Sequence, residues 1–431
     1  MVIQLLEYTN FFFASSKSGK KCIFAPKWQL MIRFGIIREG KTPPDSRVPL
    51  TPEQCKAIQR QYEVDLTVQP SSGRCYTDAE YQKAVVQMSE ELDDREVLLG
   101  VKEVPIDQLI PNKTYLFFSH TIKKQAYNRD LLQAVVAKNI RLIDYEVLTD
   151  EKGKRLIAFG KFAGMVGAHN ALLTYGLRTG AFDLPRMHRF YDYAAAKVAY
   201  QKMSWPNIKI VLTGTGRVGN GAALVLRDMG IREVSAENFI SQNFEEAVFT
   251  QLKVKDYVAH QRGIQFTPKD FYKNPGDFES IFAPFTKVAD VMINGIYWDN
   301  AAPAFFSVKE MQASEWKMNV IADVTCDIAP VSSIPSTLRA STIAQPFFGF
   351  DPQTGQEIPA FSGSGVDMMT IDNLPNELPR DASKAFGAQF IAHILPEFFK
   401  SDSDILLRAT VAQQGDLGPH FEYLRDYLEG A

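Results

Sequence analysis

The chain has 431 residues, 45% of them hydrophobic and 23% charged, and its formal net charge is −3. This composition is typical of a globular protein, and the length predicts two domains rather than one. The charge gives no support to a nucleic-acid or anionic-membrane partner, and no stretch approaches the roughly 18 apolar residues of a membrane span. We therefore expect neither nucleic acid nor a membrane as a partner.

Cysteines and histidines are sparse and dispersed. The four cysteines have no C-x-x-C spacing, and the six histidines form no zinc motif. Sparse cysteine usage fits a reducing compartment better than a disulfide framework. We expect a cytoplasmic protein without a metal site.

Residues 1–30 differ from the rest of the chain. Phe11, Phe12 and Phe13 lie near the start, but no basic segment precedes them, so a signal peptide is not expected. Met31 is followed at once by the apolar run Ile32–Ile37, which is typical of a first strand. We expect the fold to begin near Met31, with residues 1–30 an appendage or a translation start assigned too early.

After Met31, short apolar runs alternate with helical patterns, which predicts an α/β domain with a parallel sheet. The loop Arg38–Pro49 carries Arg38, Lys41 and Arg47, and Pro52 then opens a helix. The expected strands are Phe34–Ile37, Val64–Val68, Val97–Val101, Thr114–Phe118 and Arg141–Asp144.

Charged and titratable residues follow three of these strands. Lys102, His120 and the pair Asp144 and Glu146 each stand where a strand ends. Functional side chains of parallel sheets lie outside the carboxyl ends of the strands, so these residues predict a site for proton transfer. Alternatively, Lys102 is a surface lysine, His120 a structural histidine, and the carboxylates solvated loop charges.

The segment Asn207–Gly230 contains the strongest motif. The apolar run Ile208–Leu212 leads into Gly214, Gly216 and Gly219, spaced as G-x-G-x-x-G, and a helix-favouring run follows. In a dinucleotide site the first glycine makes the tight turn, the second admits the pyrophosphate, and the third lets helix and strand pack closely. The helix amino terminus then offers free N–H groups to the phosphates.

The choice between NAD and NADP depends on the residue about 20 positions after the glycines, where an acid binds the ribose 2′-hydroxyl. Ser235 and Glu237 lie near that position. If Glu237 reaches the ribose, NAD is favoured. Since Ser235 equally fits a helix N-cap and no carboxylate ends the strand, we favour NADP.

Later segments complete the second domain. A long helical region from Phe159 to about Lys202 is expected as the crossover, and another helix from Pro379 to about Leu395 as the return. Strands at Ala289–Ile293 and Asn319–Val324 should deliver Tyr297 and Asp327 to the cofactor cleft. The last 30 residues are expected to form helices that return to the first domain.

Nine motifs together identify a resemblance. They resemble, in order from about Ile32 to about Phe398, those of lysine-forming saccharopine dehydrogenase, and most closely the lysine–2-oxoglutarate reductase half of bifunctional aminoadipic semialdehyde synthase. Alanine dehydrogenase is similar more distantly. The motifs are REGKTPPDSRVPLTP, LLGVKEVP, FFSHTIKKQ, RLIDYE, AFGKFAG, LTGTGRV, INGIYW, ADVTCD and IDNLPNELPRDAS.

The resemblance implies two Rossmann-like α/β domains, with parallel sheets flanked by helices and the active site in the cleft between them. A substrate domain would take residues 31–165 and about 385–431, and a dinucleotide-binding domain residues 166–384. Lys102 and His120 would transfer protons, and Arg47, Gln125 and Asp327 would bind substrate. The cofactor residues implied are Gly214, Gly216, Arg217, Val218, Gly219, Tyr297, Val324, Ile371, Asp372, Asn373 and Leu374.

The implied reaction joins lysine and 2-oxoglutarate into saccharopine, or reverses this step, with NAD(P) as cofactor. One departure is that the arginine pair expected after the A-F-G segment is replaced around His169–Leu173 by apolar and small residues. One substrate carboxylate is thus left without a partner. The alternatives are alanine dehydrogenase, another opine-type dehydrogenase, or a non-catalytic NAD(P)H-binding regulator. The exact substrates, the direction and the oligomeric state stay open.

Overall fold

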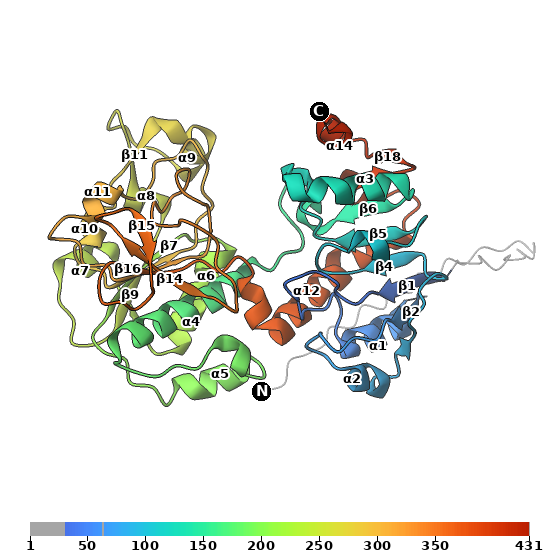
Figure 1. Cartoon of the computed structure of the whole chain (residues 1–431), viewed down its shortest axis with the longest axis horizontal. Coiled ribbons are helices and arrows are strands. Elements are labelled where there is room, and N and C mark those ends of the chain that lie inside the picture. Colours follow the sequence, from blue (N-terminus) through green and yellow to red (C-terminus); the bar gives the residue numbers. More distant parts are fainter. Residues whose placement is uncertain (1–30, 63, 431) are drawn as a thin grey trace, which may run out of the picture.

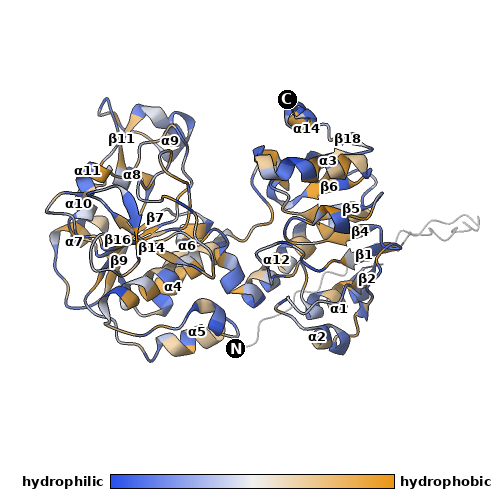
Figure 2. Ribbon diagram, in the orientation of Figure 1, coloured by the Kyte–Doolittle hydropathy of each residue, from blue (hydrophilic) through white to orange (hydrophobic). Residues whose placement is uncertain are grey.

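The computed structural model describes residues 31–62 and 64–430. The expectation that residues 1–30 are an appendage lies outside this range. The described chain forms two α/β domains side by side, each built on one eight-stranded sheet (Figure 1). Figure 2 shows hydrophobic residues gathered on the strands of both sheets, and every residue of the central strand β7 (Lys209–Thr213) is buried. The expected fold class is confirmed.

The first sheet has the order β18-β17-β6-β5-β4-β1-β2-β3. Strands β1 to β6 are all parallel to one another, so their carboxyl ends meet at one edge. Their bounds are β1 Ile32–Ile36, β2 Val64–Val68, β3 Gln87–Met88, β4 Val97–Leu99, β5 Thr114–Phe117 and β6 Arg141–Asp144.

The end of the chain returns to the first sheet as predicted, but not entirely as helices. Thr410–Gln413 forms β17, which pairs antiparallel with β6, and Asp416–Leu417 forms β18. The expectation of helices is therefore wrong for this hairpin, whose buried β-branched and apolar residues complete the sheet. Helices of this domain are α1 Pro52–Gln61, α2 Asp78–Lys83, α3 Arg129–Ala137, α13 Asp404–Arg408 and α14 Arg425–Glu429.

The second sheet has the order β15-β14-β16-β13-β12-β7-β9-β8. Its strands are parallel except for β14 and β15, which add an antiparallel edge. The remaining strands are β8 Arg232–Glu233, β9 Val248–Leu252, β12 Val291–Asn294, β13 Val320–Asp323, β14 Phe347–Asp351, β15 Gln356–Ile358 and β16 Val366–Met369. A separate hairpin pairs β10 Val258–His260 with β11 Phe278–Ser280.

Two long helices, α4 (Gly160–Thr179) and α12 (Pro379–His393), connect the domains. Helix α12 lies between the two domains (Figure 1). The predicted helical region up to Lys202 is interrupted, because α4 ends at Gly180, whose φ of 66° is left-handed. Helices of the second domain are α5 Tyr193–Tyr200, α6 Arg217–Asp228, α7 Ala236–Ser241, α8 Val254–Tyr257, α9 Pro268–Lys273, α10 Ala283–Thr286 and α11 Val308–Met311.

Small residues bring α4 against the glycine-motif helix α6. A Cβ on Gly164 would lie 1.8 Å from the carbonyl oxygen of Val218, and one on Gly221 would lie 2.1 Å from that of Lys161. Neither position admits a side chain, since such contacts are far inside van der Waals distance. The crossover helix is therefore fixed directly behind the turn that holds the glycines.

Candidate active site between the two domains

A cavity of about 520 Å³ lies between the domains. The first domain contributes Arg47, Lys102 and His120 to its wall, and the second contributes the glycine turn and the loops after β12 and β16. The predicted site residues that line it are Arg47, Lys102, His120, Gly216, Arg217, Val218, Tyr297, Asp372 and Asn373.

The three motif glycines differ in what surrounds them. Gly214 has a φ of 93°, and a Cβ there would meet the carbonyl oxygen of Gly295 at 2.5 Å. A Cβ on Gly219 would lie 2.0 Å from the carbonyl oxygen of Gly214, whereas one on Gly216 would meet nothing within 4 Å. Gly216 is the N-cap of α6 without a side-chain cap, so the free N–H groups of the helix face open space.

Lys102 follows β4 and is partly buried in the cavity wall. Burial lowers the pKa of its amine, and the nearby charges of Arg47 and Lys41 lower it further. A lysine with a lowered pKa has more of the neutral form that can accept a proton near neutral pH. Lys102 is therefore suited to act as a base.

His120 follows β5 in a left-handed conformation, with a φ of 53°. Its Nδ1 lies 2.5 Å from Oε1 of Glu103, whose Oε2 accepts a hydrogen bond of 2.8 Å from Nζ of Lys41. Burial raises the pKa of Glu103, but the hydrogen bonds and charges of these partners outweigh it and lower the pKa to about 2. An ionised carboxylate only accepts, so Nδ1 carries the proton and Nε2 is left for exchange with a substrate.

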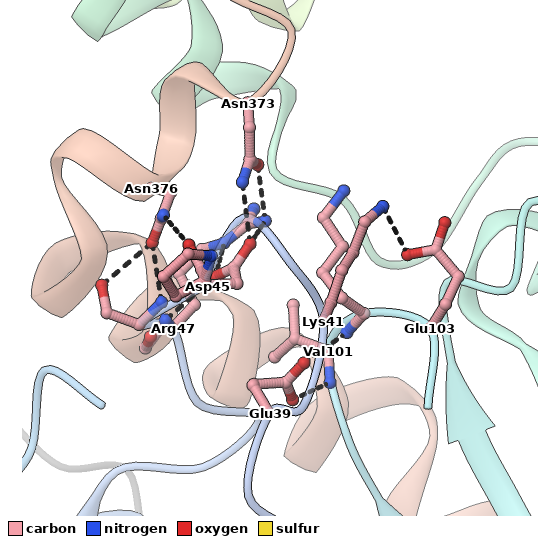
Figure 3. A network of polar contacts seen from close by, with 12 residues as sticks. Glu39, Lys41, Asp45, Arg47, Val101, Glu103, Asn373 and Asn376 are labelled. Atoms are coloured by element: carbon pink, nitrogen blue, oxygen red, sulfur yellow. Dashed lines mark hydrogen bonds and ion pairs between the residues drawn. The ribbon is translucent and has the colours of Figure 1, made fainter. Parts of the chain in front are cut away.

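Arg47 is buried, and one edge of its guanidinium is already occupied (Figure 3). Nε and Nη2 donate to the two carboxylate oxygens of Asp45 at 2.9 and 2.5 Å, and Nη2 also donates to Asn373 at 2.8 Å. Burial opposes ionisation of Asp45, but Arg47 outweighs it and holds the pKa well below its usual range. Within the described residues Nη1 has no hydrogen-bond partner, so only this end of Arg47 is available to a ligand.

Two further residues in the wall carry buried polar atoms without partners among the described residues. These are Nε of Arg155 and Oε2 of Glu146. Arg155 lies over the ring of Phe118, and burial lowers its pKa. The sequence predicts Glu146 at a strand end but assigns no role to Arg155. Its position just before the A-F-G segment was the available signal.

Other predicted residues lie outside the cavity wall. Gln125 is exposed, and its Oε1 accepts a hydrogen bond of 2.6 Å from Tyr127. Asp327 is half-buried, and burial together with Asp323 raises its pKa to about 6. Gly214, Gly219, Val324, Ile371 and Leu374 pack behind the wall.

The predicted ribose position is wrong in detail. Strand β9, not β8, pairs with β7, so the strand beside the glycine turn ends at Leu252, whose carbonyl accepts from Gly214 at 3.1 Å. The predicted candidates lie beyond the outer strand β8, where Ser235 caps α7 and Glu237 is exposed. The residue after Leu252 is Lys253, whose backbone N–H donates to the carboxylate of Asp256 at 2.7 Å.

A glycine turn at a helix amino terminus that faces a lysine and a histidine across an interdomain cleft defines a dehydrogenase. The comparisons with known proteins agree with this class. The chain is 30% identical to α-aminoadipic semialdehyde synthase of Arabidopsis thaliana over 90% of its length, covering 41% of that protein. The mitochondrial enzyme of Bos taurus is also 30% identical, with 92% and 48% covered. The chain thus spans less than half the length of these relatives.

The lysine-forming, NAD(+)-linked saccharopine dehydrogenase of Emericella nidulans is 28% identical over 83% of the chain and 90% of that protein. Residues 35–166 match the family described as alanine dehydrogenase/PNT, N-terminal domain. A solved L-alanine dehydrogenase superposes with a TM-score of 0.63 at 16% identity, covering 92% of this chain and all of that one. The homologues are thus α-aminoadipic semialdehyde synthases and saccharopine dehydrogenases, and the fold is that of alanine dehydrogenase.

Over most of its length the chain is therefore similar to proteins named as amino acid dehydrogenases, and it shares the fold of one of them. Over residues 31–62 and 64–430, no helix is both long and apolar enough to cross a membrane. The same residues contain no cluster of potential metal-binding side chains.

Proposed function

We propose that this chain interconverts lysine plus 2-oxoglutarate with saccharopine, using NADP(H). The observation that carries the proposal is that Lys102 and His120 line one cavity together with Gly216. The similarity to proteins named for saccharopine and aminoadipic semialdehyde chemistry supports the choice of substrates.

In the condensing direction, the neutral amine of lysine attacks the ketone carbon of 2-oxoglutarate. Lys102 takes the proton released by the attacking amine and returns it to the alkoxide oxygen, which forms the carbinolamine hydroxyl. A proton from His120 then lets this hydroxyl leave as water, which gives the iminium ion. The nicotinamide, when bound, would supply the hydride that converts the iminium carbon to that of a neutral secondary amine. Proton transfer by the two side chains contributes a factor of roughly 10² to 10⁴ in rate.

Of the three arginines in the cavity wall, Arg47 and Arg155 are the ones that would bind the substrate carboxylates. Among the described residues, neither Nη1 of Arg47 nor Nε of Arg155 has a hydrogen-bond partner, and Nη1 of Arg155 forms only a long ion pair of 3.9 Å with Glu146. Arg155 takes the role that the missing arginine pair leaves open. Glu146 lies beside Arg155 and is placed to pair with an ammonium group of the amino donor. We keep Gln125 and Asp327 as weaker candidates, because neither lines the cavity.

The choice of NADP is supported by the exposed Lys253 at the end of β9, because its ammonium group would attract a 2′-phosphate. The carboxylate of Asp256 accepts from the backbone N–H of Lys253 at 2.7 Å and caps α8. We assign residues 31–165 and about 385–431 to the substrate domain and residues 166–384 to the dinucleotide-binding domain, with both boundaries inside the connecting helices α4 and α12. A cytoplasmic location stays a prediction from cysteine usage.

The test is a turnover assay with lysine, 2-oxoglutarate and either NADPH or NADH, with product identified by mass spectrometry. Formation of saccharopine with NADPH, lost in Lys102→Met, is the expected result. Turnover of pyruvate with ammonium instead would indicate alanine dehydrogenase, and turnover with another amino acid a different opine-type enzyme. Cofactor binding without turnover across amino and 2-oxo acids would indicate a regulator and overturn the proposal.

A further inference from the structure

A glutamate that takes no part in the mechanism above supports the segment that carries Lys102. Glu39 lies in the loop after β1, and its carboxyl group points at the backbone beyond the end of β4 (Figure 3). Oε1 accepts a hydrogen bond of 2.6 Å from the N–H of Val101, and Oε2 accepts one of 2.8 Å from the N–H of Lys102. Both oxygens are thus used on two consecutive peptide groups.

These bonds continue a sheet where its backbone ladder has ended. The last backbone hydrogen bond between the β1 and β4 segments runs from the N–H of Ile37 to the carbonyl oxygen of Leu99 at 3.0 Å. Beyond it the two segments separate. Beyond that point the N–H groups of Val101 and Lys102 face the loop that contains Glu39. Buried N–H groups need acceptors, and the two oxygens of Glu39 supply them.

The opposite side of the same segment is held by β5. Gly100 donates to the carbonyl of Leu116 at 2.9 Å, and Phe118 donates to the carbonyl of Val101 at 3.0 Å. The β5 bonds stop at Val101, one residue before Lys102. On the Lys102 peptide itself, the N–H group is held by Glu39.

We propose that Glu39 is a positioning residue for Lys102, fixing through two backbone hydrogen bonds the direction in which this side chain leaves the sheet. The inference rests on the proposed function in so far as Lys102 is the base of the reaction. Its structural part, the control of Lys102 by Glu39, is independent of which substrates are used.

The surroundings of Glu39 explain why a substitution of this residue tests the position of Lys102 rather than the loss of an ion pair. Asp45 and Arg47 lie on the same loop, Lys102 on the neighbouring strand end, and the ring of Tyr145 on the side of β6. Burial, together with Asp45, raises the pKa of Glu39 to about 8. No lysine or arginine among the described residues forms an ion pair with it, so its loss leaves no buried cation unpaired.

The kinetic test compares Glu39→Gln and Glu39→Ala with a matched control, Glu96→Gln. Glu96 accepts one backbone bond from Arg33 at 3.0 Å in the same sheet, outside the cavity. We expect kcat to fall roughly 10- to 100-fold in Glu39→Gln, and further in Glu39→Ala, because displacement of a reacting group is costly. KM values for NADPH and 2-oxoglutarate stay within about twofold, and Glu96→Gln behaves as wild type.

The second readout does not depend on turnover. Competitive labelling of amines with acetic anhydride, followed by mass spectrometry, measures the reactivity of Lys102 directly. In Glu39→Gln the loosened Lys102 should be labelled faster than in wild type, while the exposed Lys83 is unchanged. Unchanged labelling of Lys102 overturns the proposal, even if the enzyme proves to use other substrates. Unchanged kcat, or an equal loss in Glu96→Gln, also overturns it.

Discussion

The side-chain oxygen of Asn373 lies 2.8 Å from Nη2 of Arg47, and its nitrogen donates to Asp45 at 2.9 Å. A residue of the second domain thus fixes both members of a buried ion pair in the first (Figure 3). Because Asn373 also lines the cavity, the position of the loop after β16 and the orientation of Arg47 are coupled.

Asn373→Ala should therefore raise KM for 2-oxoglutarate roughly tenfold, since a hydrogen bond to a charged group contributes about 1.5–3 kcal/mol. The matched control is Asn376→Ala. Asn376 bonds Ser46 across the same interface at 2.9 Å but does not line the cavity. Steady-state kinetics measure KM for 2-oxoglutarate in both variants. An equal change of KM in the two would show a general effect of the interface and contradict a specific role of Asn373.

Replacing the proton-transfer pair should remove turnover and spare cofactor binding. We expect Lys102→Met and His120→Ala each to lower kcat by roughly 10² to 10⁴. NADPH affinity, measured by fluorescence titration, should stay close to that of wild type, because the glycine turn lies in the other domain. Lys83→Met, at an exposed position of α2, serves as the control. A kcat unaffected by either substitution would exclude the assigned roles.

Substitution by alanine at two glycines of the motif should affect two different properties, cofactor affinity at Gly216 and protein stability at Gly219. In Gly216→Ala the methyl group meets no protein atom within 4 Å, so the melting temperature should stay unchanged while NADPH binds about tenfold more weakly. In Gly219→Ala the methyl group would lie 2.0 Å from the carbonyl of Gly214, which predicts a large loss of stability. Calorimetry and cofactor titration of the pair provide the measurements. Tight NADPH binding by Gly216→Ala would contradict the assigned phosphate position.

The Glu103–His120 pair predicts a pH-dependent contribution to stability. The folded-state pKa of Glu103, about 2, is below its ordinary value, so its ionisation stabilises the fold above about pH 4.3, and this contribution is lost as the pH falls toward 2. A shift of this size corresponds to roughly 3 kcal/mol. The stability difference between wild type and Glu103→Gln should therefore shrink between about pH 5 and 2. Urea unfolding at several pH values measures it, with the exposed Glu91→Gln as the control; a constant difference would refute the pairing.

Cofactor selectivity should depend on the residue after β9. Lys253→Ala is expected to raise KM for NADPH about tenfold and to leave KM for NADH unchanged, because only NADPH carries the 2′-phosphate. Lys255→Ala, two residues further on an exposed position of α8, is the control. Equal effects on both cofactors would show that Lys253 does not discriminate between them.

The sequence alone determined the class of fold and the principal residues of the site. Short apolar runs that alternate with helical patterns predict parallel strands, because the strands of a parallel sheet are buried on both faces. Strands β2 and β6 have the predicted bounds. The glycine motif and the strand-end positions of Lys102 and His120 follow from local rules of the same kind. Local patterns therefore sufficed wherever the chemistry depends on short-range geometry.

Only the tertiary structure decided which groups face one another. The order β7-β9-β8 places Lys253, and not Ser235, at the end of the strand beside the glycine turn, because strand order depends on packing between distant segments. Likewise, Asp45 occupies the fork of Arg47, and Glu39 holds the peptide of Lys102, through contacts that span separate loops. Such partners produce no periodic pattern in the sequence, because a hydrogen bond between two loops depends on how the whole fold positions these loops.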